Sequence, residues 1–190
     1  MSEANGSSSI DALVAELAQA RATFGAALGD IDPALLTTPG LVGDWSAREL
    51  VAHLGYWTGH AADALHAAEE GRAPEFDAEA LDVEARNATV ARVAASSDFE
   101  TVRSREEASF DALLDRLRDA DPAWLAQRTA TGDTVEHALR EDGAEHYLEH
   151  AADIRAWFTE GAADEEPDEE PDEEPDEEPD EEPDEEPDED

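Results

Sequence analysis

Histidine is the residue type in this chain best suited to chemistry, and its six occurrences include one informative pair. His146 and His150 are four residues apart, so a helix would place both imidazoles on one face, close enough to bind a single cation. A third histidine from another helix would complete a site with positions left open for water or substrate. His53 is the best third candidate, because it lies on the apolar stripe of another predicted helix. A chance pair, or two half-buried core histidines, would also fit the spacing.

The remaining histidines, His60, His66 and His137, fit a metal site less well. His60 shares the stripe of His53 but lies two turns further on, about 10 Å along the helix axis, which is too far to bind the same ion. The sequence therefore favours a solvated position, or one at the rim of a pocket, for all three.

Two aspartates are spaced to support the histidine pair. Asp142 comes four residues before His146, and Asp153 comes three residues after His150. On a helix, either carboxylate could accept a hydrogen bond from the second ring nitrogen of its histidine and so orient the imidazole.

Five other residues are candidates for the reaction or for the pocket. Glu145, Tyr147 and Glu149 are candidate catalytic proton carriers, although solvated surface positions explain the two glutamates as well. Trp57 lies one turn beyond the histidine of its helix and is expected to line the pocket mouth, unless it only packs in the core. Asn87 is a candidate polar group of the pocket or an exposed helix residue.

Amphipathic helices must position these residues. Apolar side chains recur with helical periodicity, which predicts helices over residues 9–28, 46–71, 81–93, 99–120 and 133–161. Ser8 or Ser9 is expected to cap the first helix, and Ser46 with Glu49 forms a capping box at the start of the second. A turn or short helix is expected after Asp121 and Pro122.

The elements together predict an all-α fold. Alternating strand patterns are absent from the sequence, and long amphipathic helices bury their stripes most simply as a four-helix bundle. The connection through residues 72–98 is too long for a tight hairpin, so it predicts a long crossover. Residues 1–8 are expected to be disordered, residues 9–162 to form the bundle, and residues 163–190 to form a disordered acidic tail.

The tail repeats DEEP six times from Asp164 and holds 21 of the 52 acidic residues. With no apolar side chain, it has nothing to bury that would offset the entropy of ordering. Residues 1–163 keep 31 acidic residues against 12 arginines, a net charge of −19. This charge argues against partners rich in phosphate, so neither nucleic acid nor an anionic membrane is expected. The absence of lysine fits either a GC-rich genome or adaptation to high salt.

Cysteine is absent, which excludes disulfides, thiolate metal sites and cysteine nucleophiles. The first residues lack the basic and apolar regions of a signal peptide, and no apolar run reaches the length of a membrane span. A cytoplasmic protein is therefore expected.

Two segments carry a resemblance to a known family. GDWSARELVAHLGYW (residues 43–57) and EHYLEHAADIRAWF (residues 145–158) resemble the DinB-like (DinB/YfiT-type) superfamily of four-helix-bundle metalloenzymes. Within it, the chain is most similar to the DfsB-type group, which is related to the colibactin self-protection protein. The shared features are Trp45-Ser46, His53 with Trp57 four residues further on, Asn87, the His-Tyr-x-Glu-His run at residues 146–150 and the Ile-Arg-Ala-Trp run at residues 154–157. Their order and separation are fairly specific across residues 10–160.

The resemblance implies a bundle whose metal ligands are His53, His146 and His150, with zinc or nickel as the typical divalent metal. Mycothiol-dependent maleylpyruvate isomerase is a related branch. The N-terminal domain of that enzyme also has a tryptophan with a histidine several residues further on. It has a glutamate at the position of His146, however, which argues against assigning the isomerase activity to this chain. The resemblance to the DfsB-type group does not by itself imply a metal in every member.

Two classes of function follow. The first is a metal-dependent hydrolase or small-thiol-dependent transferase that acts on a small electrophilic or toxic molecule, in a stress or self-protection role. A low-molecular-weight thiol would then be a second cofactor, supplied from outside because the chain has no cysteine. The alternative is a non-catalytic bundle that binds a small ligand or forms a homodimer.

Overall fold

The computed structural model describes the backbone of residues 3–79 and 82–163 and the side chains of 9–79 and 82–159. The predicted acidic tail from residue 164 lies outside the described residues. The α-helices are α1 (Glu3–Gly29), α2 (Ala47–Glu69), α3 (Val83–Ala94), α4 (Phe99–Arg118), α5 (Pro122–Leu125), α6 (Val135–Leu139) and α7 (His146–Ala163). Two short 3₁₀-helices, η1 (Pro33–Leu35) and η2 (Ala73–Glu75), and a π-helix, η3 (Arg140–Glu145), complete the elements. Because the described residues contain no β-strand, the predicted all-α class is confirmed.

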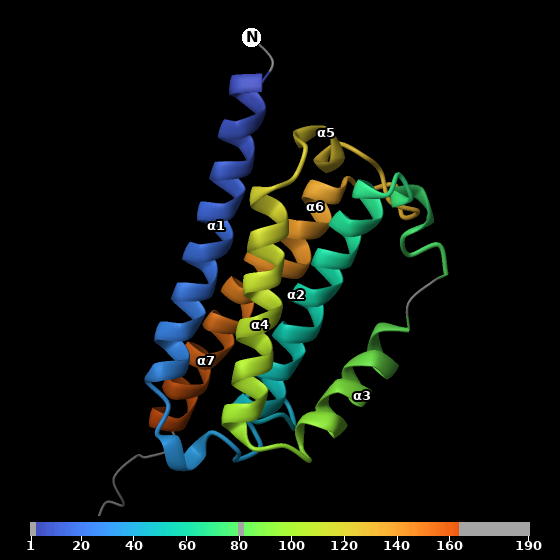
Figure 1. The fold of residues 1–190 in the computed structure, drawn as a ribbon. Coiled ribbons are helices and arrows are strands. Elements are labelled where there is room, and N and C mark those ends of the chain that lie inside the picture. Colours follow the sequence, from blue (N-terminus) through green and yellow to red (C-terminus); the bar gives the residue numbers. More distant parts are fainter. Residues whose placement is uncertain (1–2, 80–81, 164–190) are drawn as a thin grey trace, which may run out of the picture.

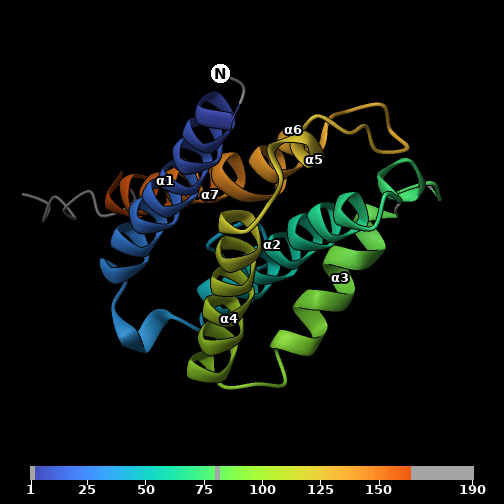
Figure 2. The same cartoon turned by 45° about the horizontal axis from the view of Figure 1, so that its top comes forward.

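Four long helices form the bundle. In Figure 1, α1 and α7 run from top to bottom, whereas α2 and α4 run from bottom to top. The packing is most extensive between α2 and α4, and α1 packs along α7. Parallel neighbours need a return connection, and α3 supplies it by running back beside α2. Figure 2 places α3 on the side of α2 that faces away from α1. The long crossover predicted for residues 72–98 is therefore present.

The start of α2 follows the local signal in the sequence. The hydroxyl of Ser46 accepts a hydrogen bond from Arg48 N at 3.2 Å, and Glu49 accepts one from Ser46 N at 3.0 Å. This is the predicted capping box, which satisfies backbone groups that the first turn leaves unpaired. At the other end, Gly71 has φ of 72°, in the left-handed region that glycine adopts readily, so the chain can turn away from the helix there.

Several helix boundaries differ from the predicted ranges, most of them by one or two residues. α1 begins at Glu3, so its start is not at Ser8 or Ser9 as expected. α4 ends at Arg118 rather than near residue 120, and α7 continues past the predicted stop at Gly161 to Ala163. Part of the predicted start of α3, Leu81, lies outside the described residues.

The last predicted helix is interrupted by the π-helix η3. Thr134 caps α6, and the six residues of η3 then lead directly into α7 at His146. In η3 the buried Gly143 lies so close to α1 that a Cβ atom there would meet Leu17 Cδ2 at 2.6 Å. A glycine therefore lets this segment approach α1. The wider turn of a π-helix changes which residues share a face with His146.

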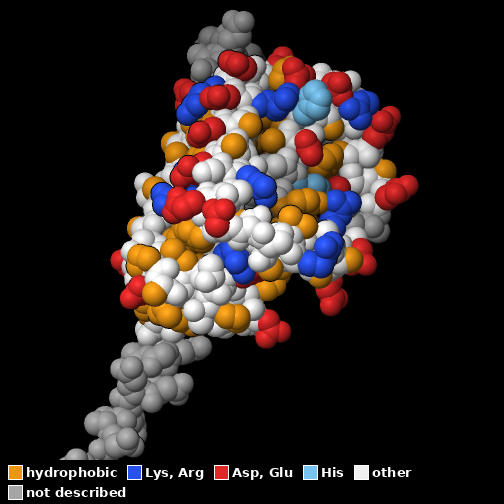
Figure 3. Space-filling view, turned by 60° about the horizontal axis from the view of Figure 1, so that its bottom comes forward, with side chains coloured by type: hydrophobic (Ala, Val, Ile, Leu, Met, Phe, Trp, Pro, Cys, Tyr) orange, Lys and Arg blue, Asp and Glu red, His pale blue; other side chains and the backbone are white. Residues whose placement is uncertain are grey.

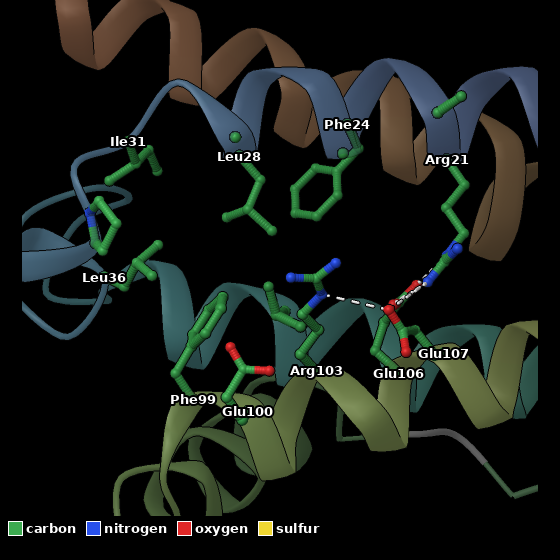
Figure 4. A pocket seen from close by; sticks show the side chains of 15 residues that line it. Arg21, Phe24, Leu28, Ile31, Leu36, Phe99, Glu100, Arg103, Glu106 and Glu107 are labelled. Carbon is green, nitrogen blue, oxygen red and sulfur yellow. Dashed lines mark hydrogen bonds and ion pairs between the residues drawn. The ribbon is translucent and has the colours of Figure 1, made fainter.

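A buried polar network crosses the bundle core. Arg21 on α1 donates two hydrogen bonds of 2.7 Å each to Glu106 on α4. Tyr147 on α7 also donates to Glu106, and Thr58 on α2 donates to the Tyr147 hydroxyl at 3.2 Å. The network thus connects all four long helices. Figure 4 shows Arg21 reaching Glu106 at one end of a cleft of about 440 Å³ between α1 and α4.

Charged side chains of both signs share the surface. On the face drawn in Figure 3, arginines are interspersed among acidic side chains. Among the described residues, no helix is both long enough and apolar enough to cross a membrane.

Candidate metal centre

Three histidines from two helices converge on one side of the bundle. His53 projects from α2, and His146 and His150 project from the first turns of α7. One potential ligand atom from each lies within 4.8 Å of the other two. His53 Nε2 and His146 Nε2 are 2.8 Å apart, somewhat closer than the roughly 3.3 Å expected for two nitrogens on one tetrahedral zinc. We call this group the histidine triad.

Two ring nitrogens of the triad have no partner, whereas the Nε2 atoms of His53 and His146 lie at hydrogen-bond distance from each other. His150 Nδ1 is 2.7 Å from Asp153 Oδ2 and donates to that carboxylate, so in the neutral ring Nε2 carries the lone pair. His150 Nε2 is buried and has no hydrogen-bond partner, and the same holds for His53 Nδ1. A buried polar atom without a partner costs free energy. An ion placed among these imidazoles would remove that cost at His150.

The surroundings keep His53 and His146 neutral. Burial, and then the nearby His146 and His150, lower the pKa of His53 to about 3. Burial and the nearby His150 lower the pKa of His146 to about 4. Neutral imidazole is the form that binds metals, so His53 and His146 are ready to bind at neutral pH without losing a proton first. The donor set, the orphaned nitrogen and the protonation state therefore all fit a divalent ion.

Stability of the metal-free protein is expected to rise with pH because of these two histidines. Their pKa values in the folded state lie below the ordinary value of 6.5. Below pH 6.5 the unfolded chain therefore binds more protons than the folded one, and each histidine lowers the free energy of unfolding by at most about 1.4 kcal/mol per pH unit of acidification. This loss in the free energy of unfolding is absent above pH 6.5, and it stops growing below about pH 3 to 4, where the folded protein also binds the protons.

Chemical denaturation of the chelator-treated protein between pH 4.5 and 7.5 measures this slope. A variant with His53→Gln and His146→Gln is the control, because it keeps the carboxylates but removes both titrating groups. Its free energy of unfolding should depend less steeply on pH than that of the wild type. Equal slopes would show that the two histidines are protonated as readily in the folded protein as in the unfolded one.

Trp57 and Asn87, both proposed for the pocket, lie together beside the triad. Trp57 Nε1 donates a hydrogen bond of 3.0 Å to Asn87 Oδ1, which connects α2 to α3. Both residues line a pocket of about 630 Å³ that includes the triad. Trp45 lines it too, with its ring centroid 5.0 Å from that of His53. Trp57 is thus both buried and part of the pocket lining, and its role in the site stays a prediction.

The Asp142 carboxylate does not contact the His146 side chain as expected, although the backbone of Asp142 hydrogen-bonds to that imidazole. The carboxylate instead binds His60 Nδ1 at 2.7 Å. The expectation assumed α-helical spacing between the two residues, but Asp142 lies in the π-helix, where the turn is wider. The carboxylate is consequently directed toward α2.

Of the two positions that the sequence favoured for His60, solvated or at the rim of a pocket, the structure excludes the first, because the His60 side chain is only 12% exposed and lines the pocket. His60 is held between two carboxylates, because its Nε2 also lies 3.2 Å from Asp77 Oδ1. Burial by itself would lower the pKa of His60, but the hydrogen bond and charge of Asp142, together with Asp77, outweigh burial and raise it. His60 lines the same pocket as the triad. No local signal marks this arrangement, because Asp77 and Asp142 lie in segments far from His60 in the sequence.

The three candidate proton carriers lie in different environments. Tyr147 is fully buried in the core network and does not line the pocket. Burial and Glu106 raise its pKa, so it is poorly suited to carry protons near neutral pH. Glu145 is exposed and also lies outside the pocket lining, whereas Glu149 is exposed at the pocket wall. Of the three, only Glu149 remains a candidate for the reaction.

The fold and the triad define a helical bundle with a candidate metal centre. Residues 17–155 match the family model described as the mycothiol maleylpyruvate isomerase N-terminal domain. The match covers most of the chain, so the chain belongs to this family, which is part of the DinB-like superfamily of four-helix proteins. No curated protein and no solved structure shows a significant match to the chain. The superfamily inferred from the sequence is thus confirmed, while the finer resemblance to the DfsB-type group stays a prediction.

Proposed function

We propose that this chain is a divalent-metal-dependent enzyme that acts on a small electrophilic molecule. The observation that carries the proposal is the convergence of three imidazoles, one with a buried and unpartnered Nε2, inside a pocket large enough for a small substrate. His53, His146 and His150 would hold the ion, with zinc or nickel as the expected metal. A bound ion of this kind lowers the pKa of water or of a small thiol and so supplies a nucleophile at neutral pH.

The residues around the triad have distinct proposed roles. Asp153 orients His150 by accepting a hydrogen bond from its Nδ1–H, and Trp57 with Asn87 shapes the pocket beside His53. Glu149, at the pocket wall, is the proposed proton carrier. Its exposure lets it exchange protons with solvent.

We favour transfer of a low-molecular-weight thiol to the electrophile over hydrolysis: the thiolate sulfur would bond to the electrophilic carbon, and the leaving group or the adduct would take up the proton that the thiol gave up. Membership in a family described by a mycothiol-dependent isomerase supports it. The thiol must come from outside the chain, which has no cysteine. A role in self-protection against a toxic electrophile rests on the resemblance to the DfsB-type group and is part of the same proposal.

A non-catalytic bundle that binds a ligand or forms a homodimer remains the second candidate. The exposed apolar side chains of Leu148 and Phe158 on α7, 46% and 39% accessible, favour it, because they would be covered in a dimer.

Experiments on the cobalt-loaded full-length protein can distinguish thiol transfer, hydrolysis and simple ligand binding. Cobalt(II) accepts the same nitrogen and sulfur ligands as zinc and reports them in its absorption spectrum. N-acetylcysteamine is expected to produce a new thiolate-to-cobalt band, whereas the matched alcohol N-acetylethanolamine should not. Hydrolysis of electrophilic esters without such a band would support the hydrolase instead. If the loaded protein shows neither the band nor turnover, the enzyme proposal is wrong and the binding bundle is favoured.

A further inference from the structure

The charges around the histidine triad are unusual for a site that would bind an anion. Five carboxylates line its pocket, from Asp77, Asp133, Glu141, Asp142 and Glu149, and no arginine lines it within the part of the chain that the structure describes. His60 already lies between Asp77 and Asp142. The arginines of the chain lie elsewhere, including on the face drawn in Figure 3.

Three of these carboxylates, Asp133, Glu141 and Glu149, are exposed at the pocket edge, and we call them the rim carboxylates. Among the described residues no arginine forms an ion pair with any of them. Asp133 accepts a hydrogen bond from Thr131 at 3.0 Å, and Glu141 lies 3.7 Å from the exposed His137. The rim therefore carries negative charge that the protein itself leaves largely uncompensated.

Aromatic side chains line the same pocket. Trp45, Trp57 and Phe76 all contribute to its wall. The face of an aromatic ring carries partial negative charge and attracts cations, most strongly in tryptophan. Aromatic rings and carboxylates together are the combination that recognises organic ammonium groups.

The buried histidines show that the pocket is built to receive a ligand. His53 and His150 are 5% and 8% exposed, and each has a ring nitrogen without a partner. Acidic residues alone would not define a site, but here they surround buried donors that the fold leaves unsatisfied.

We infer that the substrate of this pocket carries a positive charge, as an organic ammonium group attached to an apolar or aromatic body. The inference rests on the proposed function for the reacting group, which would lie at the triad, while the ammonium group would lie between the rim carboxylates and the tryptophans. A substrate with a carboxylate would find no arginine partner in the pocket lining and would be repelled by the rim. The site is therefore not suited to dicarboxylate substrates.

Three probes of matched shape test the inference on the full-length protein: 2-phenylethylammonium, 2-phenylethanol and 3-phenylpropionate. Binding is followed by calorimetry and by tryptophan fluorescence, with and without one equivalent of zinc. The ammonium probe is expected to bind at least about tenfold more tightly than the alcohol, and the carboxylate more weakly than either in the metal-free protein. Equal or tighter binding of the alcohol or the carboxylate to the metal-free protein would overturn the inference.

A matched pair of variants distinguishes the effect of the rim carboxylates on binding from the effect of the overall negative charge of the chain. The rim variant carries Asp133→Asn, Glu141→Gln and Glu149→Gln. The surface variant removes the same number of charges from exposed residues outside the pocket lining, with Asp11→Asn, Asp63→Asn and Asp111→Asn. The rim variant should bind 2-phenylethylammonium about tenfold more weakly than the wild type, and the surface variant should lose less than about twofold. Similar losses in both variants would place the ammonium group outside the pocket.

The same experiment distinguishes this inference from the proposed function. If zinc does not bind but the ammonium preference persists and depends on the rim carboxylates, the metal-dependent function fails while the inferred specificity stands. If zinc binds but the ammonium preference is absent, the inference fails and the metal centre stands.

Discussion

Replacement of His146 and His150 by alanine is expected to remove the metal from this protein. The wild-type chain, purified without a histidine tag, should hold about one zinc or nickel ion, and the double variant should hold almost none. Each substitution removes one of three imidazoles whose ligand atoms lie within 4.8 Å of one another, and the ion would then exchange protein nitrogen for water. Either single variant should bind zinc at least about a hundredfold more weakly, because removal of a direct ligand costs more than removal of an orienting partner. Elemental analysis and calorimetry measure both effects.

Two exposed histidines provide the matched control. His66 and His137 have 44% and 51% of their side chains exposed and lie outside the triad, so His66→Ala together with His137→Ala should keep full occupancy. Circular dichroism of every variant establishes that the bundle is intact. Full metal occupancy in the double variant of His146 and His150 would contradict the triad as the metal site.

The second large effect is expected from the core network. Glu106 is 5% exposed and accepts hydrogen bonds from Arg21 and Tyr147, so Glu106→Ala would leave a partly buried guanidinium and a buried hydroxyl without their acceptor. Removing one partner of a buried ion pair costs about 3–5 kcal/mol, which for a domain of this size lowers the melting temperature by about 10 °C. The Arg21 guanidinium also lies over the Phe110 ring, 4.8 Å from its centroid, and its side chain is only 29% exposed, so water would replace Glu106 only in part. Thermal and urea denaturation measure the loss.

The neighbouring Glu107 is the control for charge alone. It is half exposed and reaches Arg21 only at 4.0 Å, so Glu107→Ala should cost less than about 1 kcal/mol. The double variant Arg21→Met with Glu106→Leu should regain part of the loss, because neither buried charge remains unpaired. Equal stability of Glu106→Ala and Glu107→Ala would show that the buried network contributes no more than a surface pair.

The local features of this protein followed from its sequence. The capping box at Ser46, the helical stripes and the all-α class depend on spacing within one segment, and spacing is a local property. The pairing of His150 with Asp153 is also a local feature, because the two residues are three apart on a regular helix. Spacing within one segment could not predict that His53 approaches the histidines of α7. The contact was predicted because His53 lies on the apolar stripe of its helix, which packs inward.

The tertiary structure decided which neighbours the polar side chains meet. Asp142 contacts His60 instead of His146 because the π-helix, pressed close to α1 at Gly143, changes the turn on which the expectation depended. Tyr147 is adjacent in sequence to a triad histidine, yet one residue of helix rotates a side chain by about 100°, which directs Tyr147 to Glu106 in the core. The acidic and aromatic wall of the pocket likewise joins residues from α2, the crossover and the segment before α7. Contacts between distant segments depend on how whole helices pack, and for that reason the polar environment of the triad emerged only from the folded bundle.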